Sequence, residues 1–419
     1  MKPDPALNGT RPRTTTHPPE GAPEGGPHGG GRIRELEGYR GIAALSTVVF
    51  HVWQHYTPHG PAGPQPPLTD RFSRAVFSFE IVDLFFVLSA FLLTLGYARD
   101  AIDRRPTRSA RTFLYRRAVR ILPLYWTAIL VVWATRNPDL PGDWIDLVEH
   151  LTFTQVFDRE RIFYTIGASW SMSLEIMFYG LLMMLGPAAT RACRRLERRA
   201  ARVAVCAAGC AALYAAPVAW LVTARYVLAI PSTDWPAYYG PQARFHAFAA
   251  GMLLAVAIAA LDGRGRLGHR GAATARLATI AALAALTWAA TDPARPDGAA
   301  TLLYHPAASA LWVMLLYATV HVRHEARWHR ALRARWLTGT GLVSYSLYLW
   351  HEPIMIALDD AGALPGGPAG FAPALLIVLA VAVPAAAASY WLIEYPAALL
   401  RRLRDSSHHR RDYYPELSR

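Results

Sequence analysis

The sequence is poor in cysteine and in lysine. Among its 419 residues are three cysteines, Cys193, Cys206 and Cys210, and their spacing supports neither a disulfide framework nor a zinc site. Cys206 and Cys210 lie four residues apart in an alanine-rich apolar run, so on a helix they share one face. We interpret them as small residues that pack between helices. Lys2 is the only lysine, so arginine supplies almost all of the positive charge.

Common catalytic motifs are also missing, and no cleavable leader sequence is expected. The chain contains no Gly-x-Ser-x-Gly elbow, no Walker loop, no Cys-x-x-Cys and no His-Glu-x-x-His. A serine hydrolase of the elbow type, an ATPase and a zinc enzyme are therefore unsupported, and no metal is expected. Residues 1–31 lack the apolar segment of a cleavable signal peptide. Their Pro, Gly, Thr and His content predicts a disordered cytoplasmic tail.

Long apolar runs are what the sequence does contain. Hydrophobic residues make up 53% of it, and several runs reach or approach the length of a membrane helix. We predict an all-α, polytopic membrane protein with about ten transmembrane helices. The membrane domain covers 32–400 and is followed by a basic cytoplasmic tail, 401–419. The predicted spans lie at about 38–56, 72–97, 122–135, 168–188, 203–222, 245–261, 272–291, 301–320, 338–358 and 371–393.

Positive charge alternates between the connections that join these spans. Of the 43 lysine and arginine residues, 35 fall in the two tails and in every second connection. The positive-inside rule places those segments, and with them both termini, in the cytoplasm. The net charge of +13 is spread between apolar runs and is not gathered on a soluble domain. This pattern argues against nucleic-acid binding and predicts a lipid bilayer as the partner.

Arg40 and His51 stand eleven residues apart in the first span. A helix would carry His51 roughly 16 Å inward from Arg40, about half of a hydrocarbon core roughly 30 Å thick. A histidine at that depth is costly and is by default a functional candidate. The alternative is that His51 caps a neighbouring helix or lines a polar seam.

Arg117 and Arg120 lie three residues apart at the cytoplasmic end of the third span. On a helix they share a face, where two guanidinium groups make a fork for phosphate or pyrophosphate. A soluble anionic cofactor such as coenzyme A would fit there. The alternatives are ordinary positive-inside charge or contact with anionic lipid head groups.

Glu175 is an acid in the otherwise apolar fourth span and needs a partner. Candidate partners are His51 and the arginines. A His–Glu pair suits general-base catalysis, and the alternative is a structural ion pair between helices. Asp83 in the second span is a further intramembrane acid, for which Arg40 and Arg74 are the expected partners.

The ninth span carries a polar stripe. Tyr345, Tyr348 and His351 follow one another at intervals of three residues, which places them on one helix face. Pro353 is expected to open the helix locally, as membrane helices tolerate beside a cavity. The alternative is that the aromatic residues anchor the helix at the membrane interface. His246 in the sixth span is a lone membrane histidine to which the sequence assigns no role.

Taken together, these stretches resemble the acyltransferase-3 family of integral membrane O-acyltransferases over about residues 34–396. Five fragments in order carry the resemblance: Glu37-Gly-Tyr-Arg-Gly-Ile-Ala-Ala-Leu with His51, Asp83-Leu-Phe-Phe-Val-Leu-Ser, Arg117-x-x-Arg120-Ile with Pro123 and Tyr125, Ser169-Trp-Ser-x-Ser-Leu-Glu175, and Tyr345-Ser-x-Tyr348-x-Trp-His351-x-Pro353. The sequence departs from the family at Ala90, where glycine is usual, and at Tyr39, where leucine is common.

The resemblance implies transfer of an acyl group from cytoplasmic acyl-CoA to a hydroxyl group, at the plasma membrane and without a metal. Acetyl-CoA is the default donor. The implied acceptor is a carbohydrate, a cell-envelope glycan or a glycosylated secreted metabolite. A proton-coupled transporter or flippase is the alternative, because intramembrane His and Glu also suit proton-coupled transport.

The resemblance also implies roles for individual residues. His51 would act as general base or transient acyl carrier, Glu175 would orient it, and tyrosine or serine hydroxyls would donate to the thioester oxyanion. The expected site residues are, for catalysis, His51, Glu175, Tyr345 and Tyr348; for donor binding, Arg40, Arg117 and Arg120; and lining the substrate, Asp83, Trp170, Ser173 and His351.

Overall fold

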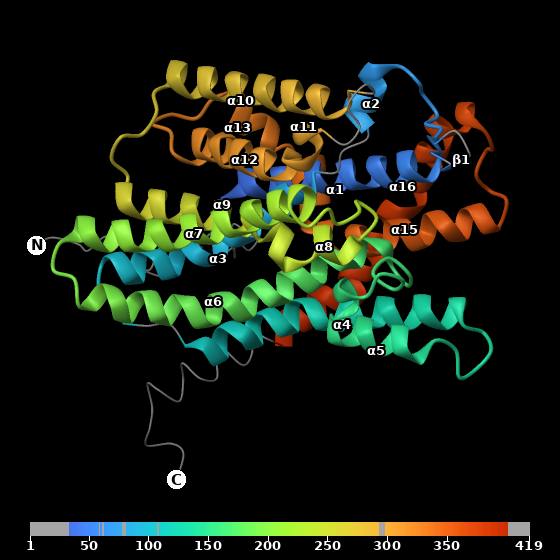
Figure 1. Ribbon diagram of the computed structural model, residues 1–419, viewed down its shortest axis with the longest axis horizontal. Coiled ribbons are helices and arrows are strands. Elements are labelled where there is room, and N and C mark those ends of the chain that lie inside the picture. The colour runs from blue at the N-terminus through green and yellow to red at the C-terminus, as the bar shows by residue number, and fades with distance from the viewer. Residues whose placement is uncertain are drawn as a thin grey trace, which may run out of the picture. The chain divides into compact units, whose positions relative to one another are not determined.

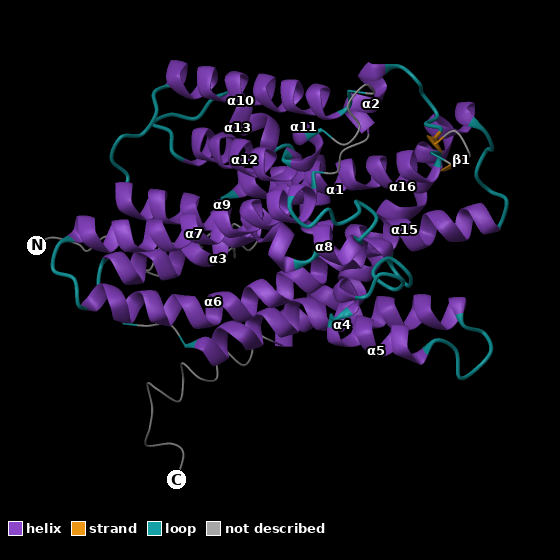
Figure 2. Cartoon of the chain, viewed as in Figure 1, coloured by secondary structure: helices purple, strands orange, loops and turns teal. Residues whose placement is uncertain are grey.

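Helices form most of the chain that the computed structural model describes, residues 33–57, 59–60, 63–77, 81–106, 109–292 and 298–400 (Figures 1 and 2). The predicted tails, 1–31 and 401–419, lie outside the described residues. The α-helices are α1 (Arg34–His55), α2 (Arg71–Phe77), α3 (Val82–Ile102), α4 (Ala110–Arg136), α5 (Trp144–Thr152), α6 (Trp170–Arg194), α7 (Arg199–Tyr226), α8 (Trp235–Tyr239), α9 (Pro241–Leu261), α10 (His269–Ala290), α11 (Ala299–Leu302), α12 (Tyr304–Val320), α13 (Arg327–Leu332), α14 (Arg335–Leu342), α15 (Ser344–Asp360) and α16 (Phe371–Ser389). Shorter elements are the 3-10 helices η1 (Gln155–Phe157), η2 (Gly167–Ser169) and η3 (Pro368–Gly370), the π-helix η4 (Tyr390–Glu394), and the strands β1 (His59–Gly60) and β2 (Gly63–Pro64).

Each predicted span falls on one or two of these helices. Within the described residues, seven helical stretches are long and apolar enough to cross a membrane by length and composition. They are Arg71–Ile102, Ala110–Arg136, Gly167–Arg194, Arg199–Tyr226, Trp235–Leu261, His269–Ala290 and Pro368–Leu400. The prediction of an all-α, polytopic membrane protein is confirmed. The count of ten and the side of the termini stay predictions, because α12 and α15 have only 17 residues each and α1 begins with charged turns.

Two local predictions were wrong. The ninth predicted span is divided at Val343 into α14 and α15. α15 continues through Pro353, which was expected to open it. The connection 136–165, which lies between two predicted spans, contains α5 and η1. α5 starts where it does because the Asp143 side chain accepts a hydrogen bond from the backbone N–H of Asp146, as a good N-cap does.

Glycines set the place of α1, the helix that carries Arg40 and His51. A methyl group added at Gly38 would collide with the carbonyl oxygen of Leu332, and one at Gly41 with that of Leu337. α1 can therefore lie directly on the backbone of α13 and α14. This close approach fixes the rotation of α1 about its axis, and so the direction in which Arg40 points.

The two departures from the family pattern both lie in helix contacts. The Tyr39 hydroxyl lies 2.8 Å from Thr319 Oγ1 and accepts a hydrogen bond from the Trp328 indole, so it joins α1 to α12 and α13. Ala90 on α3 is fully buried and faces Gly251 on α9, where a side chain would meet its methyl group. The methyl group that replaces the usual glycine is therefore accommodated by Gly251.

The basic connections gather at one end of the helices. Arg199 at the start of α7 donates to the carbonyl oxygen of Ala260 at the end of α9, and Arg202 donates to that of Ile102 at the end of α3. In Figure 1 the α6–α7 and α9–α10 connections lie at one end of the helices, and the α4–α5 and α15–α16 connections lie at the other. This arrangement is the one that the charge alternation predicts.

Candidate active site

A cavity of about 120 Å³ lies between α1, α3, α4, α6 and α15. We call it the arginine cavity. Six of the residues that the sequence singled out line it together: Arg40, Arg117, Arg120, Glu175, Tyr345 and Tyr348. They come from four helices far apart in the sequence, so the fold, and not the local pattern, assembles the group.

Cations outnumber acids in the wall of the arginine cavity. Arg117 and Arg120 lie one turn apart on α4, and Arg40 reaches the same cavity from α1. The charges of Arg40 and Arg120 repel one another. Arg40 is attracted by Glu37, Glu175 and Glu394, and Arg120 is attracted by Glu394. Arg40 and Arg120 make no hydrogen bond or ion pair with a described side chain. Three guanidinium groups facing one lining carboxylate make a site that suits a polyanion.

Glu175 has neutral partners, and the predicted His51–Glu175 pair does not form. Its Oε1 accepts hydrogen bonds from the hydroxyls of Ser89, at 2.7 Å, and Tyr179. The carboxylate is therefore held in the arginine cavity, where it lies near Arg40. In this position Glu175 lies close enough to Arg40 to attract its charge, and it makes no contact with His51.

His51 is paired with a second histidine. Nδ1 of His51 lies 2.7 Å from Nε2 of His351, and the two rings stack with centroids 4.8 Å apart. Both side chains are buried. The pair lies next to the arginine cavity, because the ring of Tyr348, which lines that cavity, is 6.0 Å from the ring of His351.

The hydrogen bonds of this pair assign the proton positions. Nδ1 of His351 lies 3.1 Å from the carbonyl oxygen of Leu347, which can only accept. His351 therefore donates through Nδ1 and accepts through Nε2, so that His51 donates through its own Nδ1. The lone pair of the neutral His51 is then on Nε2, the nitrogen that a general base would use.

The predicted partner of Asp83 was also wrong. Asp83 on α3 pairs with His305 on α12, with Oδ2 and Nδ1 2.6 Å apart, and not with Arg40 or Arg74. Asp83 and His305 lie outside the wall of the arginine cavity. The sequence offered no local signal for this pair, because His305 lies more than two hundred residues further along the chain.

The hydroxyls that were expected to stabilise an oxyanion already have acceptors. Tyr345 donates to the carbonyl oxygen of Ile121, and Tyr348 lies within hydrogen-bond distance of the carbonyl oxygen of Ala168 and of Ser171 Oγ. A tyrosine hydroxyl carries one proton, so neither has a second to give. Both tyrosines therefore hold α15 to α4 and to the start of α6.

Two predicted substrate-lining residues are buried away from the arginine cavity. Ser173 is fully buried, and its hydroxyl has no hydrogen-bond partner in the described part of the chain. Trp170 packs edge-on against Phe86 and Tyr239. Among the described residues no group of three or more His, Cys, Asp or Glu side chains is placed to hold a metal.

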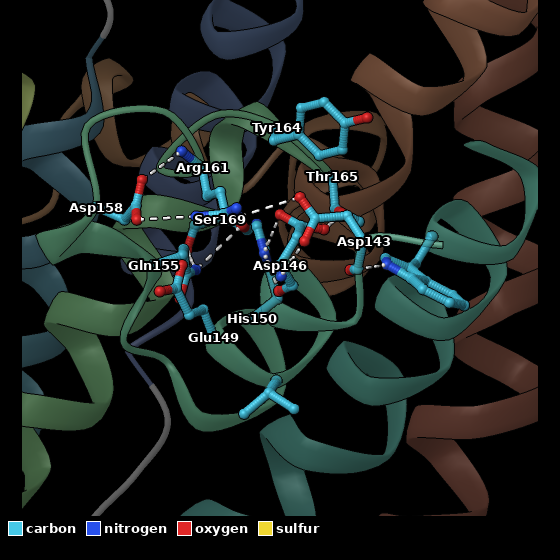
Figure 3. A network of polar contacts seen from close by, with 12 residues as sticks. Asp143, Asp146, Glu149, His150, Gln155, Asp158, Arg161, Tyr164, Thr165 and Ser169 are labelled. Atoms are coloured by element: carbon cyan, nitrogen blue, oxygen red, sulfur yellow. Dashed lines mark hydrogen bonds and ion pairs between the residues drawn. The ribbon is translucent and has the colours of Figure 1, made fainter. Parts of the chain in front are cut away.

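A second polar cluster, shown in Figure 3, lies in the connection between α4 and α6. His150 Nδ1 is 3.0 Å from Asp146 Oδ1, and Thr165 also donates to Asp146. Arg161 forms ion pairs with Asp143 and Asp158. The backbone N–H of Asp146 and the Arg161 guanidinium lower the pKa of Asp143. This cluster ties the connection into one folded piece, and the sequence analysis missed it.

Comparison with known proteins gives one match. The chain matches the family model of an acyltransferase domain, of the acyltransferase-3 type, over residues 33–393. No curated protein matches in the second comparison, and no solved structure in the third. The matched stretch includes the whole arginine cavity and the His51–His351 pair.

Proposed function

Because the chain belongs to the acyltransferase-3 family and is a multi-pass membrane acyltransferase, we propose that it transfers an acyl group from acyl-CoA to a hydroxyl group. The acyl group is acetyl by default, and the acceptor is a carbohydrate, a cell-envelope glycan or a glycosylated secreted metabolite. The membrane is the plasma membrane, which separates cytoplasmic acyl-CoA from such acceptors.

The observation that carries this proposal is the excess of cations in the arginine cavity. Coenzyme A is a polyanion, and Arg40, Arg117 and Arg120 face one cavity that has a single carboxylate in its wall. Guanidinium groups bind phosphate in a fixed, forked geometry. By the charge alternation these arginines lie toward the cytoplasmic side, where acyl-CoA is found.

The acyl chain and thioester would extend from the arginines toward His51. Nε2 of His51 takes the proton of the acceptor hydroxyl as the oxygen attacks the thioester carbonyl. The carbon–sulfur bond breaks, and the proton leaves with the CoA thiolate. The same nitrogen would carry the acyl group if transfer takes two steps. His351 keeps the proton of His51 on Nδ1 in either route.

Glu175 takes a different role from the one that the sequence suggested. Its carboxylate is held by Ser89 and Tyr179 and lies near Arg40. We assign it the positioning of the donor-binding arginines. A negative charge among three positive ones also lowers their mutual repulsion when the donor is absent.

The test is acyl transfer by the purified protein in detergent. Protein incubated with radiolabelled acetyl-CoA and a panel of glycans should release CoA and label one class of acceptor. Because detergent micelles enclose no compartment, a transporter would give no product. Release of CoA at the background rate with every acceptor and acyl chain tested would overturn the proposal.

A further inference from the structure

The arginine cavity has an apolar side that its donor-binding arginines do not explain. Its lining residues on α3 include Val82, Phe85, Phe86, Ser89, Leu92 and Leu93. Their spacing of three and four residues places them on one helix face, and all but Ser89 are apolar. At about 1.5 Å per residue, this face runs along the cavity for roughly 16 Å. Phosphate groups gain nothing from such a face, so it is available to an apolar part of the donor.

The arginines of α4 lie beside the later half of α3. Phe113, one turn before Arg117 on α4, packs edge-on against Tyr97 in that half of α3. The first turn of α3, which carries Val82 and Phe86, lies about three turns before Tyr97, toward the other end of the cavity. The cavity therefore has a cationic end and an apolar end.

The residues that line the apolar end are here called the aromatic wall: Val82, Phe85, Phe86, Met172 and Tyr348. The rings of Phe85 and Tyr348 meet edge-on with centroids 5.8 Å apart. Met172 comes from the first turn of α6, where the neighbouring Trp170 packs edge-on against Phe86. The ring of Tyr348 is 6.0 Å from that of His351. The aromatic wall is therefore the part of the cavity that lies beside the histidine pair.

The aromatic wall is held in place from behind. Phe86 stacks on Phe248 with centroids 4.5 Å apart, and Phe248 stacks on Phe178 at the same distance. All three side chains are at most 2% exposed. The Tyr348 hydroxyl is 2.9 Å from the carbonyl oxygen of Ala168, which fixes its ring as well. Rings packed this closely have no space to turn into, so the wall does not widen for a longer ligand.

The volume of the arginine cavity limits what can lie against the aromatic wall. An engineered apolar cavity of about 150 Å³ holds a single benzene ring, and the arginine cavity measures about 120 Å³. It has to admit the thioester of the donor as well as the acyl chain. The space that is left suits a chain of about two to four carbons.

From this geometry we propose that the aromatic wall is the acyl-binding part of the donor site and that it determines the length of the acyl chain. It admits acyl groups of about two to four carbons and rejects longer ones, and Phe86 and Met172 set the limit. One methylene group more or less in a hydrophobic pocket changes the discrimination between ligands by roughly 10–200-fold. This inference rests on the proposed acyl-CoA donor and adds to it a class of acyl group and the residues that select it.

The experiment measures the binding of CoA thioethers to the full chain in phosphatidylcholine nanodiscs by titration calorimetry. S-ethyl-, S-butyl- and S-hexyl-CoA carry alkyl chains that cannot be transferred, so no acceptor is needed, and free CoA is the reference. Empty nanodiscs correct for partition of the alkyl chains into lipid. We expect the ethyl and butyl thioethers to bind at least as tightly as CoA. The hexyl thioether should bind at least about tenfold more weakly than the butyl thioether.

Two variants widen the aromatic wall, and a third is their control. Phe86→Leu should bring the affinity for S-hexyl-CoA to within about threefold of that for S-butyl-CoA. Met172→Ala makes room from α6 in the same way, and it tests the wall if Phe86→Leu does not fold. Phe91→Leu is the same substitution on the same helix, at a side chain that is 1% exposed and does not line the cavity. It should leave the order of the affinities unchanged.

The pattern of binding separates failure of the aromatic wall from failure of the donor. Equal affinity for all three thioethers, or the tightest binding for the hexyl chain, would overturn the length limit and leave CoA as the donor. A shift in Phe91→Leu equal to that in Phe86→Leu would reject Phe86 as the residue that sets the limit. If the folded protein bound neither CoA nor any thioether, the proposed donor itself would be wrong, and the acyl-binding role of the wall with it.

Discussion

The arginine cavity and the polar cluster of the α4–α6 connection are both rich in charged groups, but the groups are paired differently. In the connection, Arg161 is shared between Asp143 and Asp158, and Asp146 is held by His150 and Thr165. In the arginine cavity, Arg40 and Arg120 have no ion-pair partner among the described residues. Charges that neutralise one another hold a chain segment in place. Charges left facing a cavity are those that a ligand can use.

The histidines show the same contrast. His150 is fully enclosed and lies in the connection between α4 and α6, where it does not line the arginine cavity. His51 is held by His351 through one nitrogen, and its other nitrogen remains for chemistry. Burial and a hydrogen-bonded partner therefore do not distinguish a catalytic histidine from a structural one. Neither histidine lines the arginine cavity, but His51 lies beside it through His351 and Tyr348, and its proposed role rests on that position.

The largest effect is expected from His51→Ala. Loss of a general base lowers kcat by about 10²–10⁴-fold, while the bundle around α1 keeps its glycine contacts. The measurement is initial-rate acyl transfer, normalised to protein that elutes as a single species. His55→Ala is the matched control, one turn further along α1 in an exposed pair with Asp359, and it should keep nearly full activity. Full transfer by the His51 variant would reject its assignment as base or acyl carrier.

A smaller effect is expected from the paired changes Arg117→Gln and Arg120→Gln. Each removes a charge-assisted contact to phosphate of about 1.5–3 kcal/mol, so KM for acyl-CoA should rise by at least tenfold. Because these contacts hold the donor and not the reacting atoms, kcat should change little. Arg116→Gln removes a neighbouring arginine that does not line the cavity. If Arg116→Gln raised KM as much, the cavity would not be the donor site.

A third prediction concerns His351, which acts through His51. His351→Ala should lower kcat by about tenfold or more and leave KM for acyl-CoA unchanged, because the tautomer of His51 is no longer fixed. His351→Gln retains a carbonyl acceptor for His51 Nδ1 and should recover part of the rate. A structural role alone would lower the thermal midpoint in both variants and would show no recovery in kcat.

The fourth prediction is a change that lowers stability and leaves catalysis unchanged. Asp146→Asn in the connection should leave kcat and KM unchanged for the folded protein but lower its stability by about 1–3 kcal/mol, since it weakens the buried contacts to His150 and Thr165. Thermal unfolding followed by tryptophan fluorescence measures the loss. A reduced kcat at unchanged stability would show that this cluster contributes to catalysis and not only to stability.

Much of the site could be predicted because charge is so rare inside apolar helices. Arg40, Arg117, Arg120 and Glu175 each stand out against their span, and the structure brings all four to one cavity. The helix positions followed from apolar length, for the same physical reason. The residue-by-residue roles were inferred from family resemblance, and the experiments above test them.

The contacts between helices could not be predicted. A membrane helix is apolar on most faces, so periodicity does not say which face meets which neighbour. Asp83 was therefore matched with Arg40 or Arg74, whereas His305 reaches it from α12. The partners of Glu175 were missed for the same reason, although Ser89 lies in one of the fragments that carried the resemblance.

The smallest effect is expected from Asp143→Asn, and its value lies in its dependence on pH. The backbone N–H of Asp146, and then Arg161, hold the pKa of Asp143 below its ordinary value of 3.8. A carboxyl group whose pKa is lowered by folding stabilises the protein at any pH above its pKa in the unfolded chain. This contribution disappears as the pH falls through the pKa of the folded protein. Asparagine still caps α5, so the change isolates the charge.

At pH 7 the loss of stability should be about 1 kcal/mol or less, since the pair with Arg161 is partly exposed. As pH falls from about 4 to below the folded pKa of Asp143, the stabilities of the variant and the parent should converge, because the parent also loses its charge. Asp139→Asn, an exposed change in the same connection, is the control. A difference between variant and parent that persisted at low pH would show that Asp143 acts by packing and not by charge.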